Sequence, residues 1–128
     1  MNRSIPILLF VAAAALACAG GCTGGKYING YSTYTGGNAR QGKALLAAYG
    51  CGSCHTIPGV PDARGLVGPP LYFWARRTYI AGELPNTPAN LVKWIESPAS
   101  VEPNTAMPTL GVSEDEARDM AAYLYTIR

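Results

Sequence analysis

The sequence predicts an all-α domain of three or four helices joined by Pro- and Gly-rich loops. Three observations carry this prediction. Segments with apolar residues at helical spacing follow capping residues, prolines and glycines crowd the stretches between them, and no run alternates apolar and polar residues as a half-buried strand would. The 128 residues leave room for one domain. We therefore expect a single helical domain without a sheet or an internal repeat.

Two helices are expected in the first three quarters of the chain. The first spans 38–49, where Asn38 can cap the start and Gly50 ends the run. The second begins at Pro88, because Thr87 is a favourable N-cap and proline is favoured at the first helical position. It ends before Pro98. The apolar residues at helical spacing are Leu45, Leu46 and Tyr49 in the first helix and Leu91, Trp94 and Ile95 in the second.

The last helix has the clearest start signal. Ser113 and Glu116, three residues apart, form a capping box. The apolar stripe that follows consists of Ala117, Met120, Ala121 and Leu124. Because about 90 residues in short helices make a poor core by themselves, we expect an apolar group to fill the middle of the domain. The side chains expected around that group are Leu71, Phe73, Trp74 and Trp94.

The start of the chain predicts export. Arg3 supplies a positive charge, and the apolar run 5–17 that follows is shorter than the roughly 20 residues that a membrane-spanning helix needs. We expect 1–17 to be a signal that is removed, which places the mature protein in the periplasm.

A leader follows the signal. Residues 18–37 are rich in Gly, Ser, Thr and Tyr without an apolar period, which predicts a flexible segment ahead of a folded domain over 38–128. The sequences before Cys18 and Cys22 resemble loose lipoprotein cleavage boxes. Either cysteine is therefore a candidate for a lipid tether to a membrane; alternatively, Cys18 belongs to the signal and Cys22 is an incidental thiol.

The charge balance excludes a generic nucleic-acid binder. Without Arg3 the chain has nine basic and eight acidic residues, which leaves too little positive charge for phosphate binding. Six of those basic residues lie in 18–77, whereas seven of the acidic ones lie in 78–128. This distribution predicts one basic and one acidic end, although scattered surface charge is the plainer interpretation.

The segment Cys51-Gly52-Ser53-Cys54-His55 predicts a covalently attached haem. In Cys-x-x-Cys-His, two thiols add to the two vinyl groups and the adjacent histidine binds the iron. Three alternatives compete: a zinc site, a redox-active dithiol and a structural disulfide. A zinc site needs two further Cys or His ligands, but His55 is the only histidine.

The second axial ligand of such an iron is then Met, Lys or an open position. Met107 is the best candidate, because it lies in a loop restrained by Pro103 and Pro108. Met120 falls on the apolar stripe of the last helix, which favours packing. The alternative for Met107 is a loop methionine packed on the domain. His/Met ligation closes both axial positions and suits electron transfer.

At this point the chain resembles the class I cytochrome c family, in a compact bacterial form. The resemblance covers about 38–128 and rests on GKALLAAYGC over 42–51, on the Cys-x-x-Cys-His segment, on VGPPL over 67–71 and on LVKWIESP over 91–98. It implies the class I fold around one haem c per chain, and Tyr123 packed against Gly42 where the first and last helices cross.

The resemblance also implies roles for residues around the haem. The carbonyl of Pro69 would accept a hydrogen bond from the imidazole of His55, and Trp94 would pack on the haem. Arg77 and Tyr79 would hold a haem propionate; for Arg77 the alternative is a surface cation.

The function implied is that of a single-electron carrier, not an enzyme. Its partners would be redox proteins, a respiratory complex upstream and a terminal oxidase or reductase downstream. Two alternatives stay open: a permanent haem subunit of an oxidase or dehydrogenase complex, and a haem enzyme or sensor with an open distal site.

Overall fold

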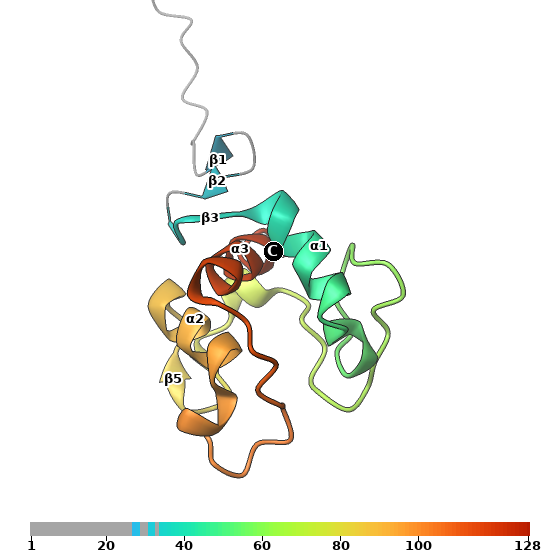
Figure 1. The fold of residues 1–128 in the computed structure, drawn as a ribbon, viewed down its shortest axis with the longest axis vertical. Helices are drawn as coiled ribbons and strands as arrows, with labels where there is room; N and C mark the ends of the chain where they lie inside the picture. Colours follow the sequence, from blue (N-terminus) through green and yellow to red (C-terminus); the bar gives the residue numbers. More distant parts are fainter. Residues whose placement is uncertain (1–26, 29–30, 33) are drawn as a thin grey trace, which may run out of the picture.

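The computed structural model describes residues 27–28, 31–32 and 34–128 (Figure 1). Three α-helices dominate it, with three turns of 3-10 helix and five strands of two residues each among these residues. The helices are α1 (Ala39–Ala48), α2 (Pro88–Glu96) and α3 (Glu114–Leu124), and the 3-10 turns are η1 (Cys51–Ser53), η2 (Trp74–Arg76) and η3 (Pro98–Ser100). The prediction of a mostly helical domain is confirmed.

The predicted helix starts are confirmed in detail. The Asn38 side chain accepts hydrogen bonds from the backbone N–H groups of Arg40 and Gln41. The Thr87 side chain accepts one from the backbone N–H of Asn90, and Pro88 occupies the first turn of that helix. Ser113 and Glu116 form the reciprocal capping box. Each helix therefore begins where its local sequence satisfies the otherwise unpaired N–H groups.

The crossing of α1 and α3 is a contact between backbones (Figure 1). A Cβ built at Gly42 would overlap the carbonyl group of Asp119, so only glycine allows this approach. The Asp119 carboxylate in turn accepts the N–H of Asn38 at 2.6 Å. Tyr123, which the resemblance implies as the partner of Gly42, donates its hydroxyl to the carbonyl of Pro58 at 2.7 Å. The aromatic thus fixes the loop after His55.

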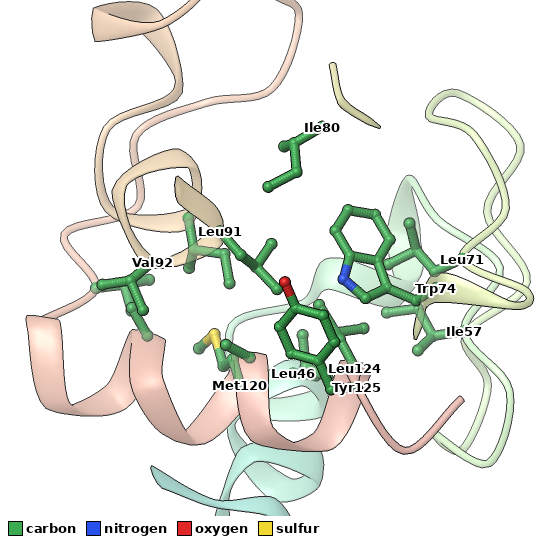
Figure 2. Close-up of a cluster of buried hydrophobic side chains, with 14 of the residues drawn as sticks. Leu46, Ile57, Leu71, Trp74, Ile80, Leu91, Val92, Met120, Leu124 and Tyr125 are labelled. Carbon is green, nitrogen blue, oxygen red and sulfur yellow. The ribbon is translucent and has the colours of Figure 1, made fainter. Parts of the chain in front are cut away.

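The core lies between α3, α2 and η2. Figure 2 shows Met120, Leu124 and Tyr125 of the α3 region beside Leu91 and Val92 of α2, with Trp74, Ile80 and Leu71 around them. Ile80, Leu91 and Met120 are almost completely buried. The apolar stripe predicted for the last helix therefore does form one wall of the core.

The expectation that the domain has no strands is wrong, because short strands pair with one another. The strands β1 (Tyr27–Ile28), β2 (Tyr31–Ser32) and β3 (Gly37–Asn38) pair in antiparallel order, and β4 (Tyr79–Ile80) pairs with β5 (Leu84–Pro85). Two residues are too few to show an alternating pattern. The fold class is unchanged by them.

Within 18–37, the segment that the sequence predicts to be a flexible leader, the described residues nearest α1 are packed. Ser32 and Thr35 are buried, and a Cβ at Gly37 would overlap the backbone of Arg118 in α3. The ring of Tyr34 meets that of Tyr125 edge to face, with 5.1 Å between centroids. Ordered packing therefore begins several residues before α1, through contacts with distant residues that local sequence does not reveal.

The predicted signal over 1–17 and the candidate tether residues Cys18 and Cys22 lie outside the described residues. Within the described part of the chain, no helix combines the length and apolar character needed to cross a membrane.

The contact at Gly42 can be tested by Gly42→Ala. The added methyl group has to push α1 away from α3, and we expect a loss of about 1–3 kcal/mol in the free energy of unfolding. Urea denaturation followed by circular dichroism measures this loss. Lys43→Ala, an exposed change in the same helix, is the control and should stay within about 0.5 kcal/mol. Equal stability of the two variants would contradict the proposed backbone contact.

Candidate functional site

A cavity of about 570 Å³ opens between the loop that follows α1 and the loop that precedes α3. In Figure 1 these are the green loop on the right and the orange to red loop on the left. The cavity brings together the eight residues that the sequence and the family resemblance suggest for haem attachment, iron ligation and haem contacts. The residues concerned are Cys51, Cys54, His55, Pro69, Arg77, Tyr79, Trp94 and Met107.

The turn with the two cysteines begins where α1 ends. Gly50 has φ of 69°, a left-handed conformation that glycine adopts without strain, and it redirects the chain into η1. The 3-10 turn then brings Cys51 and Cys54 to the same cavity. Gly65 lies so close to the backbone of Ser53 and Cys54 that a Cβ there would overlap it. The following loop thus packs directly against the turn.

The imidazole of His55 is held in one tautomer. Its Nδ1 lies 2.7 Å from the carbonyl oxygen of Pro69, and since a carbonyl only accepts, Nδ1 carries the proton. In the neutral ring Nε2 is then the nitrogen with a lone pair for a metal ion, and the hydrogen bond makes the ring a stronger donor. A Cβ at Gly68 would overlap the ring. The histidine is therefore oriented by the loop around Pro69.

Arg77 and Trp74 both line the cavity, and their side chains carry N–H donors. The Arg77 guanidinium donates to the carbonyl of Pro70 and lies over the Trp74 ring, 5.2 Å from its centroid. Trp74 is buried, and its Nε1 is the one buried side-chain nitrogen or oxygen without a hydrogen-bond partner in the described part of the chain. An N–H left this way costs about 1–3 kcal/mol, so an acceptor on a bound group would stabilise it.

Met107 and Trp94 line the cavity from the second half of the chain. Met107 lies in the loop after η3, where its N–H donates to the Thr105 hydroxyl at 3.2 Å. Trp94 projects from α2. Phe73, expected around the central group, does not line the cavity and is 58% exposed. Its left-handed φ of 53° accompanies this outward placement.

No disulfide joins Cys51 and Cys54 in the structure. Burial raises the pKa of the Cys51 thiol, and the neighbouring Cys54 raises it further. The structural-disulfide alternative is therefore not the arrangement seen. The zinc alternative lacks ligands as well, because no group of three or more His, Cys, Asp or Glu side chains with metal-binding spacing occurs among the described residues.

One further contact joins the cavity to the start of α3. Tyr49, which lines the cavity, donates its hydroxyl to Glu116 at 2.9 Å. The Ser113 N–H and hydroxyl lower the pKa of the Glu116 carboxyl, and the Tyr49 hydroxyl lowers it further. The same contact raises the pKa of Tyr49. The capping box of α3 thus also orients a residue beside the cysteine turn.

The comparison with protein families agrees with this geometry. A model of the cytochrome c family, described as "Cytochrome c", matches residues 39–128, which is most of the chain. The chain therefore belongs to the cytochrome c family. It binds covalently attached haem c, and its class is that of haem-binding electron carriers that work with redox partner proteins. A search of the curated proteins returned no match.

The residues present fit haem c. Two thiols and an imidazole whose Nδ1 is bonded to Pro69, which leaves Nε2 as the nitrogen for a metal ion, line one cavity, whose walls include Leu71 and Trp94. The unpartnered Trp74 Nε1 suits an acceptor such as a haem carboxylate.

Some contacts of the site were missed from the sequence. Tyr49 was assigned only to a helix face, and Asn86 was given no role, although it hydrogen-bonds the segment that carries Trp74 and Arg77. The turn residues Ala81 and Gly82 also line the cavity. Nothing in the local sequence separates Asn86 from an ordinary turn residue before a helix cap.

The lowered pKa of Glu116 gives a pH prediction. A carboxyl whose pKa is lower in the folded than in the unfolded protein stabilises above its unfolded pKa, and this contribution disappears as the pH falls through the folded pKa. We expect Glu116→Gln to destabilise the protein near neutral pH and to approach the unaltered protein below the ordinary value of 4.5.

Urea denaturation at a series of pH values measures the difference between the two proteins. Glu114→Gln serves as the control, because Glu114 pairs only with Arg118 in an exposed i,i+4 contact. A Glu116→Gln difference that is constant across the pH series would refute the assignment.

Proposed function

We propose that this chain is a single-electron carrier in which His55 and Met107 are the two axial ligands of a haem attached through Cys51 and Cys54. The observation that carries the proposal is that these four side chains line one cavity although Met107 lies 56 positions after Cys51. Haem c supplies the one-electron change between ferric and ferrous iron. The protein supplies the ligands, the apolar surroundings and the route of access.

The order within the site supports this assignment. The Pro69 carbonyl fixes the proton of His55 on Nδ1, which orients Nε2 as the donor toward iron. Met107 is restrained by its N–H bond to Thr105 and by Pro108 on its C-terminal side. A thioether is a weak ligand, so a restrained backbone favours its retention. With both axial positions closed, electron transfer is favoured over binding of oxygen or peroxide.

The residues around the ligands support the role of the cavity as a haem pocket. Trp94 provides an apolar wall, and Arg77 with Trp74 offers donors for haem carboxylates. Tyr79 also lines the cavity, with 57% of its surface exposed. We assign the propionate contacts to Arg77 and Trp74, with Tyr79 at the rim.

The setting of this carrier is part of the proposal. Cytochrome c domains are typically exported, and the charged and apolar pattern of 1–17 is that of an export signal. We propose that the protein works in the periplasm between a respiratory complex and a terminal oxidase or reductase, tethered through Cys18 or Cys22 by a lipid. Mass spectrometry of the protein purified from the membrane fraction tests the tether. An unmodified N-terminus would show that the protein has no lipid tether.

The distal ligand is tested by Met107→Ala in the haem-loaded protein. The ferric variant should lose the sulfur-to-iron charge-transfer absorption, and the ferrous variant should bind carbon monoxide, which the unaltered protein should not do. Absorption spectroscopy measures both.

Met120→Leu is the matched control, because Met120 is buried in the core and this exchange preserves volume at a cost below about 1.5 kcal/mol. It should retain the sulfur absorption. If Met107→Ala retained that absorption, or if the unaltered protein bound carbon monoxide readily, the site would be an open one and the carrier proposal would fail.

A further inference from the structure

Asn86 occupies a junction between the cavity wall and the C-terminal segment. Its side-chain Nδ2 donates to the carbonyl oxygens of Trp74 and Arg77, each at 3.0 Å, and its backbone N–H donates to Thr78 at 2.9 Å. These bonds span both ends of η2. Trp74 and Arg77, two cavity residues whose side chains carry N–H donors, therefore have their backbones fixed by one amide.

The orientation of that amide is set from the other side by Tyr125. Since the two carbonyls only accept, Nδ2 faces them and Oδ1 faces the Tyr125 hydroxyl, which donates at 2.8 Å. Burial raises the pKa of Tyr125, and Tyr34 raises it further, so the hydroxyl keeps its proton at neutral pH. Both polar groups of the Asn86 side chain are therefore engaged, Nδ2 as a donor and Oδ1 as an acceptor.

The contacts of Asn86 extend toward the N-terminal segment through Tyr125 and toward the cavity through Arg77. Beyond Tyr125 lies Tyr34, whose ring meets it at 81°, and Tyr34 precedes residue 39, where the family match begins. On the cavity side, Arg77 donates to the carbonyl of Pro70, next to the Pro69 carbonyl that orients His55. One series of contacts therefore connects the N-terminal strands with the loop that holds the histidine.

From this geometry we propose that Asn86 is a positioning residue that fixes Trp74 and Arg77 toward the carboxylates of the haem and thereby raises its reduction potential. The inference rests on the proposed function. Positive charge and N–H donors near the haem favour the ferrous state, which has one positive charge less than the ferric state. If η2 loosens, the hydrogen bonds from Trp74 and Arg77 to the haem carboxylates weaken and water enters. Each of these changes favours ferric iron.

The test uses the haem-loaded full chain with Asn86→Leu, which keeps the approximate volume and removes all three side-chain hydrogen bonds. The first measurement is hydrogen exchange of the Trp74 indole N–H in the ferrous protein, followed by NMR. It should become at least about fivefold faster, because the local opening of η2 costs less. The Trp94 indole, on a different element, serves as an internal reference.

The second measurement is the equilibrium of electron exchange with a redox mediator. The constant for reducing the protein should fall by about three- to tenfold, a tenfold change corresponding to about 59 mV for one electron. Tyr125→Phe, which removes only the bond to Asn86 Oδ1, should shift both quantities in the same direction by less. Asn90→Ala is the control, because its amide donates to Pro85 at 2.9 Å in the same stretch without contacting η2.

The outcomes separate the possibilities. Faster Trp74 exchange with a lowered potential in Asn86→Leu, and neither in Asn90→Ala, supports the positioning role. If Asn86→Leu leaves both the Trp74 exchange rate and the reduction potential unchanged, the positioning role is overturned. If Asn86→Leu does not take up haem, an unchanged exchange rate and potential in Tyr125→Phe overturn the role. An open distal site would appear in the spectrum of the unaltered protein, so failure of the proposed function is recognised separately.

Discussion

The close approach of α1 and α3 at Gly42 is the contact on which the rest of the molecule depends. Because no side chain separates Gly42 from the carbonyl of Asp119, the ends of both helices have fixed positions. The end of α1 places the cysteine turn, and the start of α3 places Glu116 against Tyr49 beside that turn. Tyr123 on α3 then holds the loop after His55 through Pro58. Two helices thus determine one side of the haem pocket.

The other side of the pocket is built from loops, and loops need explicit hydrogen bonds to keep a geometry. Here the bonds converge on a few carbonyls. Pro69 accepts from His55, Pro70 accepts from Arg77, and the carbonyls of Trp74 and Arg77 accept from Asn86. In a domain this small, such bonds replace part of the core that longer helices would provide. The covalent attachment of haem c adds apolar contacts at the centre.

The sequence predicted what local chemistry determines. The caps Asn38, Thr87 and Ser113 and the cysteine turn could be identified because each depends on residues within four positions of it. Contacts set by tertiary packing could not be identified: β3 forms where the chain meets α3, and Asn86 accepts a hydrogen bond from Tyr125, 39 residues away. Phe73 was misplaced because its apolar character predicted burial, whereas its left-handed backbone accompanies an exposed side chain. Sequence chemistry thus identified the candidate ligands, and the structure adds the hydrogen bonds around them.

The central claim is that one covalently attached haem in this chain has both axial positions closed by His55 and Met107. Its most direct test is the intact mass of the purified protein together with absorption spectra of its ferric and ferrous forms. The account predicts a mass increased by one haem, a sulfur-to-iron charge-transfer absorption in the ferric form, and a ferrous spectrum that carbon monoxide leaves unchanged. A mass without haem, or a ferrous spectrum that carbon monoxide alters at once, would contradict it.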